Sequence, residues 1–302
     1  MTLGFIGLGT IGGPMAMKLL EHHRALRVFD IAVAARRAFA EQGAQVAASV
    51  AEIAAACTTV FLSLPGPSQI AEVVLGADGL LSHAHALTTV VDLSTNSVSL
   101  NREIAATAHA KNISYLDAPV SGGKVAARAG TLAVMVGGDE PAFNAIRPLL
   151  QCFAEHIFYM GPTTAGTLTK LVNNQIFLSA SVLIQEAFVM GAKAGMDPSA
   201  LLEVLKVSSA GSLLSRAPLV LSRKFDLDVF ALSSAAKDIA IALDSAHAVG
   251  AVTPLTAAAC EIYQAALKQG LGAEDFFATV KVLEAHAGIE LAPLAIPKAT
   301  HG

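Results

Sequence analysis

The chain has 302 residues, which is long enough for two domains; 54% of them are apolar and only 15% are charged. The net charge of −4 and the lack of a basic stripe argue against nucleic acid as a partner. No uninterrupted apolar run reaches the roughly 18 residues of a membrane-spanning helix, so no membrane partner is expected. So much apolar surface favours self-association, and we expect a homodimer or homotetramer.

The cysteines and the N-terminus predict a cytoplasmic protein. Cys57, Cys152 and Cys260 are widely spaced and form no CxxC motif, which favours reduced thiols. The first residues enter a strand pattern at once, which leaves no room for a signal or transit peptide. Because the cysteines and histidines are scattered along the chain, we predict no metal site.

A glycine-rich turn follows the first predicted strand. That strand spans residues 3–7, and Gly7-Leu8-Gly9-Thr10-Ile11-Gly12 then leads into a helix near Pro14. A second strand, residues 25–30, ends in Asp30, 23 residues after Gly7. Glycines at this place let the backbone approach a pyrophosphate at the helix N-terminus, and the acidic side chain accepts hydrogen bonds from the adenosine ribose. The combination predicts that residues 7–12 and Asp30 bind a dinucleotide.

Asp30 also bears on which dinucleotide binds. A carboxylate at this position repels a 2′-phosphate, so we expect NAD as the cofactor, with NADP as the alternative. Arg27, Arg36 and Arg37 lie near enough in the sequence for one of them to pair with such a phosphate, which keeps the alternative open.

The alternation of strands and helices continues to residue 161. Strands are predicted over residues 58–64, 88–95, 113–120, 132–138 and 156–161, and helices over residues 47–56, 67–75, 101–111 and 142–153. Ligands of open parallel sheets bind beyond the carboxyl ends of the strands, so we expect Leu64, Pro65 and Thr95 to line one crevice with the glycine turn. Ordinary loop roles are the alternative. Ser121-Gly122-Gly123 follows the next strand and either presents backbone N–H groups to an anion or forms a plain turn.

From residue 163 onward every segment predicts helix. The longest spans residues 167–190 and carries Lys170 and Asn174 on one face, one turn apart. Burying an ammonium and a carboxamide on an apolar helix is costly unless they have a function, although Lys170 could also extend to solvent while the asparagines cap a kink. The predicted fold class is therefore α/β, with a Rossmann-type doubly wound sheet over residues 1–162. A long interdomain helix joins it to an all-helical domain over residues 163–302.

The remaining helices are predicted over residues 200–208, 233–250, 253–268 and 274–288. Ser212 lies in a loop-to-helix passage, where it either contacts a ligand or caps the helix. Lys237 and Asp238 fall on the helix of residues 233–250, where a surface ion pair is the alternative to a functional role. The last dozen residues contain two prolines and are expected to fray.

Four stretches resemble the β-hydroxyacid dehydrogenase family, whose members include 3-hydroxyisobutyrate dehydrogenase and tartronate semialdehyde reductase. They are GLGTIGGPMAMKL (7–19), DAPVSGGKVAARAGTLAVMVGG (117–138), GPTTAGTLTKLVNN (161–174) and KDIAIAL (237–243). The resemblance implies that Lys170 is catalytic, that Asn174 orients the substrate and that Ser121, Gly122 and Gly123 anchor it. It also implies that Lys237 lies beside the nicotinamide. The sequence departs from the family pattern at Ile11, Lys18, Ala126 and Thr164.

These observations predict an NAD(P)-dependent dehydrogenase that interconverts a small 3-hydroxy acid and its semialdehyde by hydride transfer. Lys170 would serve as general acid/base; as a base it needs a pKa lowered from about 10.4, which desolvation and the positive charges of Lys237 and NAD⁺ favour. One alternative is an NADP-linked reductase of small aldehydes, such as succinic or tartronate semialdehyde. The other is a non-catalytic NAD(H)-binding protein.

Overall fold

The computed structural model describes residues 1–23, 25–226 and 229–293, and the chain forms two compact units, Met1–Val172 and Asn173–Gly302. The units divide inside one long helix, α8 (Ala165–Lys193), because the first turns of this helix bond to the sheet of the first unit. The domain division at residues 162 and 163 stays a prediction.

A mixed sheet forms the centre of the first unit. In its described residues the strand order is β3-β2-β1-β4-β5-β6-β8-β7, with β9 paired to β8. The six strands from β3 to β6 run parallel, β8 is antiparallel to β6 and β7, and β9 is parallel to β8. The strands are β1 (Leu3–Ile6), β2 (Arg27–Phe29), β3 (Gln45–Val46), β4 (Thr59–Leu62), β5 (Thr89–Asp92), β6 (Ser114–Asp117), β7 (Val120–Ser121), β8 (Leu132–Gly137) and β9 (Ala154–Gly161).

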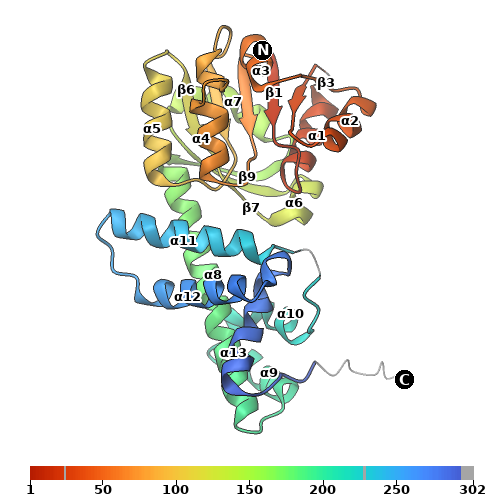
Figure 1. The fold of residues 1–302 in the computed structure, drawn as a ribbon, viewed down its shortest axis with the longest axis vertical. Helices are drawn as coiled ribbons and strands as arrows, with labels where there is room; N and C mark the ends of the chain where they lie inside the picture. The colour runs from red at the N-terminus through yellow and green to blue at the C-terminus, as the bar shows by residue number, and fades with distance from the viewer. Residues whose placement is uncertain (24, 227–228, 294–302) are drawn as a thin grey trace. The chain divides into compact units, whose positions relative to one another are not determined.

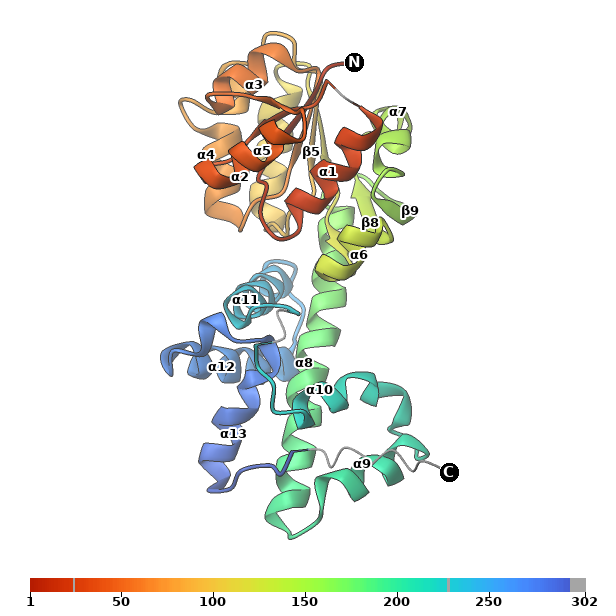
Figure 2. The ribbon, with the colours of Figure 1, turned by 90° about the vertical axis from the view of Figure 1, so that its right-hand side faces the viewer.

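Helices cover both faces of this sheet, as Figure 2 shows. Met15 of α1 and Phe143 of α7 pack on one face, while Ile53 of α3, Ile70 of α4 and Ile104 of α5 pack on the other. The helices of the unit are α1 (Gly12–His22), α2 (Val33–Glu41), α3 (Val50–Ala56), α4 (Pro67–Leu75), α5 (Val98–His109), α6 (Gly123–Ala129) and α7 (Glu140–Leu150), with a short 3₁₀ turn at Leu80–Ser82. This confirms the predicted doubly wound fold.

In the described part of the first unit, four short helices and strands were not predicted from the sequence, nor was the 3₁₀ turn: they are α2, β3, β7 and α6. Among the residues of α2 only Phe39 is buried, and both residues of β3 are exposed, so neither element carries a clear apolar pattern. The segment predicted as a strand over residues 113–120 ends at Asp117. After two residues the chain pairs with β8 as β7 and then enters α6.

The second unit is helical throughout its described residues, where a single isolated β-bridge joins Ala231 and Asp275. The rest of α8 lies among α9 (Pro198–Lys206), α10 (Ala217–Leu221), α11 (Leu232–Ala248), α12 (Pro254–Lys268) and α13 (Val280–Ala287) (Figure 1). Short 3₁₀ turns occur at Gly211–Arg216, Leu271–Ala273 and Phe276–Thr279. The helix predicted from residue 274 begins only at Val280, because the fully buried turn Phe276–Thr279 precedes it. The fraying predicted for the C-terminus concerns mainly residues 294–302, which lie outside the described residues.

Helix α8 spans 29 residues and is long and apolar enough to cross a membrane by length and composition alone. About 44% of its most apolar window is buried. Leu178, Val182 and Phe188 pack in the hydrophobic core of the second unit, and the core helix of a soluble protein passes the same test. The composition of α8 is therefore weak evidence for a membrane partner.

Candidate active site

The glycine turn after β1 has the geometry of a pyrophosphate cradle. Gly7 has φ of 94°, and a Cβ there would lie 2.1 Å from the Ser63 carbonyl oxygen. A Cβ at Gly12 would lie 2.0 Å from the Gly7 carbonyl oxygen, so α1 starts in direct contact with the turn. At Gly9 no described atom lies within 4 Å of a Cβ, which leaves the backbone open to a ligand. A tight turn, an open approach and close helix packing are the three roles that glycines have in a dinucleotide site.

The Asp30 carboxylate joins this turn to the end of β2. Its Oδ2 accepts a hydrogen bond from the Leu8 N–H at 2.6 Å and its Oδ1 accepts one from the Ala32 N–H at 2.7 Å. A carboxylate has about four acceptor positions, so two remain for ribose hydroxyls. Asp30 is thus held rigidly and still has the capacity that ribose recognition requires.

Three arginines near Asp30 have partners within the chain. Arg27 pairs with Glu52 at 3.4 Å, and Arg37 pairs with Glu41 at 3.1 Å. The Arg36 guanidinium lies over the Phe29 ring, 5.8 Å from its centroid. The ion pairs of Arg27 and Arg37 are solvent-exposed, where such pairs are worth little, and they do not by themselves exclude a 2′-phosphate.

The carboxyl ends of β1, β4, β5 and β6 lie along one edge of the sheet, because the four strands are parallel neighbours. At this edge the Leu64 N–H donates to the Ser94 Oγ at 2.9 Å, which ties the Leu64-Pro65 segment to the segment that carries Thr95. Both segments therefore leave the sheet next to the glycine turn. Whether Leu64, Pro65 and Thr95 contact the cofactor stays a prediction.

Ser121, Gly122 and Gly123 connect β7 to α6. Gly122 and Gly123 have φ of 129° and 67°, values that favour glycine. A Cβ at position 122 would also lie 2.6 Å from the Ala126 Cβ. With alanine at position 126, where the family often has glycine, position 122 therefore has room only for glycine. Both glycines are exposed, and their anchoring of a substrate stays a prediction.

A buried polar cluster lies beneath this edge of the sheet and was not predicted from the sequence. The Tyr115 hydroxyl lies 3.0 Å from Asp92 Oδ2 and 2.7 Å from Asn101 Oδ1. The Asn96 side chain donates to both of the same acceptors. Burial raises the pKa of the Asp92 carboxyl to about 6 and keeps the Tyr115 hydroxyl protonated by raising its pKa. The cluster reaches α8 through Asn101, whose Nδ2 donates to Thr167 Oγ1 at 2.5 Å.

In the second unit, a buried carboxylate orients two of the predicted site residues. Asn174 is only 4% exposed, and its Nδ2 donates to Asp238 Oδ2 at 2.9 Å. The Lys237 Nζ lies 2.7 Å from Asp238 Oδ1, so the two neighbouring residues form an ion pair on α11. The Asn173 Nδ2 donates to Asn174 Oδ1 at 3.1 Å. Asp238 therefore fixes which way the Asn174 amide points.

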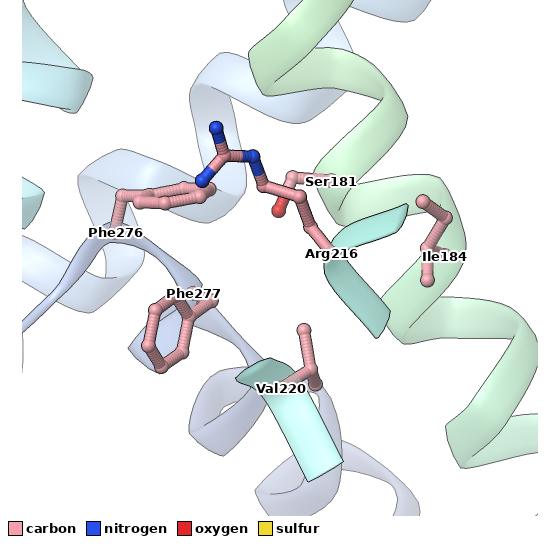
Figure 3. Close-up of a pocket in the computed structure, with 6 residues that line it drawn as sticks. All are labelled: Ser181, Ile184, Arg216, Val220, Phe276 and Phe277. Carbon is pink, nitrogen blue, oxygen red and sulfur yellow. The ribbon is translucent and has the colours of Figure 1, made fainter. Parts of the chain in front are cut away.

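Ser212 lies exposed in the 3₁₀ turn Gly211–Arg216, and its contact with a ligand stays a prediction. A small pocket in the same unit is lined by Ser181, Ile184, Arg216, Val220, Phe276 and Phe277 (Figure 3). The Arg216 guanidinium carbon lies 5.2 Å from the centroid of the Phe177 ring. None of the predicted site residues lines this pocket.

The three cysteines are free thiols, and burial raises the pKa of each, that of Cys57 to about 11. His83 and His85 form an HxH pair, a spacing that the predicted scatter of histidines overlooked. The His83 Nε2 lies 3.8 Å from Asp78 Oδ1. Among the residues that the structure describes, no group of three or more His, Cys, Asp or Glu could hold a metal ion.

Comparison with known proteins places both halves of the chain in one family. Residues 2–161 match the profile described as the NAD binding domain of 6-phosphogluconate dehydrogenase, and residues 164–283 match that described as NAD-binding of NADP-dependent 3-hydroxyisobutyrate dehydrogenase. A 2-(hydroxymethyl)glutarate dehydrogenase of Eubacterium barkeri is 37% identical over 292 residues, which cover 96% of this chain and 97% of the relative. The chain belongs to the β-hydroxyacid dehydrogenase family.

Two further comparisons agree with membership of the β-hydroxyacid dehydrogenases. A 3-hydroxyisobutyrate dehydrogenase of Pseudomonas aeruginosa is 37% identical over 272 residues, covering 86% of this chain and 90% of the relative. The structure of Mycobacterium tuberculosis 3-hydroxyisobutyrate dehydrogenase with L-serine has a TM-score of 0.84 at 32% identity, covering 93% of this chain and 98% of that one. Like its family, this β-hydroxyacid dehydrogenase is an NAD(P)-dependent oxidoreductase that acts on the CH–OH group of hydroxy acids.

The buried Asp92 carboxyl predicts a pH dependence of stability. Folding raises its pKa from 3.8 to about 6, so its contribution is fully present below 3.8 and is lost as the pH rises through 6. We therefore compare the free energy of unfolding of the wild type with that of Asp92→Asn. The difference should shift by about 1 kcal/mol in favour of the wild type when the pH is lowered from about 7.5 to about 5. Urea unfolding of both proteins across this range measures the difference, and a difference that does not change with pH would contradict the prediction.

Proposed function

We propose that this β-hydroxyacid dehydrogenase interconverts a small 3-hydroxy acid and its semialdehyde, with Lys170 as general acid/base. The observation that carries the proposal is the placement of Lys170 on α8, four residues before the buried and fixed Asn174. Residues four apart on a helix lie on the same face, so one substrate oxygen can lie within reach of both side chains. Lys170 is half-buried, which suits a group that exchanges a proton with a bound molecule.

The proposed chemistry assigns the proton to the protein. Bound NAD(P) supplies the acceptor or donor of the hydride. In the oxidative direction the neutral Lys170 amine accepts the hydroxyl proton as the C–H bond breaks and the C=O bond forms. In the reductive direction the Lys170 ammonium donates that proton to the developing alkoxide. Asn174 holds the same oxygen, and the Asp238 carboxylate keeps the Asn174 amide in place for it.

The substrate class follows from the anchoring residues and from the named relatives. The relatives are named for 2-(hydroxymethyl)glutarate and 3-hydroxyisobutyrate, and the solved structure was determined with L-serine. Each of these molecules has a hydroxymethyl group next to the carbon that carries a carboxylate. We propose the same arrangement for the substrate of this chain, with the carboxylate bound by the backbone of Ser121, Gly122 and Gly123 and the hydroxyl at Lys170.

We propose NAD as the preferred cofactor, bound with its pyrophosphate at Gly7–Gly12 and its adenosine ribose at Asp30. The negative charge that the Asp30 carboxylate brings to the glycine turn supports this choice over NADP, because it repels a 2′-phosphate. Leu64, Pro65 and Thr95 are further proposed cofactor contacts, and Lys237 is the proposed contact beside the nicotinamide. An NADP-linked reductase of succinic or tartronate semialdehyde is the alternative, and it would reverse the cofactor preference.

We also propose that the protein is a cytoplasmic homo-oligomer that associates through α8. Ile176, Leu183 and Met190 are 66%, 58% and 71% exposed and are spaced seven residues apart, so they form one apolar stripe along the helix. Val204 and Val207, near the end of α9, are 61% and 88% exposed. Apolar side chains at seven-residue spacing are typical of helices that pack against another helix, and a second copy of this chain presents the same stripe.

Replacing Lys170 tests the function directly. Lys170→Ala should reduce turnover by about two to four orders of magnitude with the best substrate, because the proposed proton acceptor and donor is removed. The affinity for NADH should stay nearly unchanged. A screen of small 3-hydroxy acids and semialdehydes, followed through NADH absorbance, identifies the substrate first. Comparable turnover in the variant would exclude the acid/base role.

Replacing Asp30 tests the choice of cofactor. Asp30→Asn keeps an acceptor for the Leu8 or Ala32 N–H but removes the charge that faces a 2′-phosphate. The ratio of kcat/KM for NAD to that for NADP should fall by about tenfold, because removing one unfavourable charge contact is worth about 1.4 kcal/mol. An unchanged ratio in steady-state assays would show that Asp30 does not discriminate between the two cofactors.

A charge on the α8 stripe tests self-association. Leu183→Lys should shift the protein to a monomer in sedimentation experiments, because an ammonium cannot be buried between apolar helices without a partner. Val252→Lys is the matched control, since Val252 is 91% exposed but lies outside the stripe. If the wild-type protein is a monomer, or if Leu183→Lys and the control have the same oligomeric state, the proposed interface is wrong.

A further inference from the structure

The start of α8 is bonded to a carboxylate that comes from far away in the sequence. Asp117, the last residue of β6, accepts the Thr164 N–H at Oδ1 at 2.8 Å and the Thr167 N–H at Oδ2 at 2.7 Å. The Thr164 and Thr167 N–H groups lie at the start of the helix, where backbone N–H groups have no acceptor within the helix itself. Most helix caps come from the residue that directly precedes the helix, whereas Asp117 lies 47 residues before Thr164. The position of α8 is therefore tied to β6.

Two glycines bring the helix and the sheet into direct contact at the same place. A Cβ at Gly166 would lie 2.2 Å from the Met135 carbonyl oxygen and 2.4 Å from the Asp117 carbonyl oxygen. A Cβ at Gly137 would lie 2.7 Å from both Asp117 Oδ1 and the Gly166 nitrogen. The first turn of α8 thus packs backbone to backbone on β6 and β8 at Gly166, and the Asp117 side chain fills the space beside Gly137.

Thr164, at this junction, has a backbone conformation that its residue type disfavours. Its φ is 81°, in the left-handed region that β-branched residues rarely adopt, and the residue is only 5% exposed. A backbone conformation of this kind costs about 1 to 3 kcal/mol and persists only where the surrounding structure requires it. The hydrogen bond from the Thr164 N–H to Asp117 is one contact that holds it.

A second link joins the same turn to the buried polar cluster. Asn101 Nδ2 donates to Thr167 Oγ1 at 2.5 Å, and the Thr167 side chain also lowers the pKa of Asp117, which burial raises overall. Asn101 is itself held by Tyr115, whose hydroxyl lies beside Asp92. Thr167 is 1% exposed, so its hydroxyl is shielded from water and held by Asn101.

We propose that Asp117 and Thr167 are positioning residues that set the location of the Lys170 amine. Lys170 follows Thr167 by three residues, one helical turn later, so a shift of the first turn moves the lysine with it. The inference rests on the proposed acid/base role of Lys170. A displacement of about 1 Å in a reacting group can cost about 100-fold in rate, whereas the cofactor contacts at Gly7–Gly12 and Asp30 do not involve α8.

Two matched pairs of variants test the proposal. Asp117→Asn replaces one acceptor by a donor and should lower kcat by about 10- to 100-fold, with the KM for the cofactor within about twofold of wild type. Asp275→Asn is the control for stability, because Asp275 is 2% exposed and its Oδ1 accepts the Val229 and Phe230 N–H groups. It should lower Tm by a similar amount and leave kcat within about twofold of wild type.

The second pair works even if Asp117→Asn does not fold. Thr167→Val removes the hydroxyl at constant shape and should lower kcat about tenfold, while Thr167→Ser keeps the hydroxyl and should restore kcat to within about threefold of wild type. Folded Asp117→Asn with wild-type kcat would overturn the proposal, as would Thr167→Val and Thr167→Ser with equal kcat. The proposal would also be overturned if Asp117→Asn and Asp275→Asn lost kcat to the same extent for the same loss of Tm.

The Lys170→Ala variant distinguishes a failure of the proposed acid/base function from a failure of the positioning role alone. Full turnover in Lys170→Ala removes the proposed function and the positioning role with it. Loss of turnover in Lys170→Ala, together with wild-type kcat in the Asp117 and Thr167 variants, removes only the positioning role. Loss of kcat in Lys170→Ala, Asp117→Asn and Thr167→Val, with recovery in Thr167→Ser, supports both.

Discussion

The hydrogen bonds from the first turn of α8 to the Asp117 carboxylate are the interaction on which the proposed active site depends. They decide the residue at which the helix leaves the sheet, and α8 carries Lys170 five residues after its first residue. Glycine at 137 and 166 leaves no space between helix and strands, so the helix start cannot slide without breaking these bonds. A flexible lysine side chain is thereby placed by rigid backbone.

Buried carboxylates recur beside the proposed site residues, and each has a different set of partners. Asp117 accepts backbone amides, Asp92 accepts hydrogen bonds from neighbouring side chains, and Asp238 faces the Asn174 amide and the Lys237 ammonium. Burying an ionised group costs several kcal/mol unless its hydrogen bonds are replaced. In the proposed site these carboxylates orient other groups, while the backbone at Gly9 and Gly122–Gly123 is exposed.

The doubly wound sheet and the helical second unit could be predicted from the sequence because both rest on local patterns. The glycine turn and Asp30 fall at fixed offsets around the first strand and helix, and α8 is a long apolar segment without an internal proline. The short elements α2 and β3 bury almost nothing, so their sequence carries little signal. Cross-strand relations could not be predicted either. Asp92 and Asp117 end neighbouring strands and are direct partners in register, but which strands are neighbours is decided by the whole fold.

The free thiols of this dehydrogenase have a chemical consequence. A cysteine attacks electrophiles and peroxides as the thiolate, and burial disfavours that anion at Cys57, Cys152 and Cys260. Near neutral pH the sulfur atoms are therefore poor nucleophiles. An aldehyde substrate or product meets no activated sulfur at these three positions.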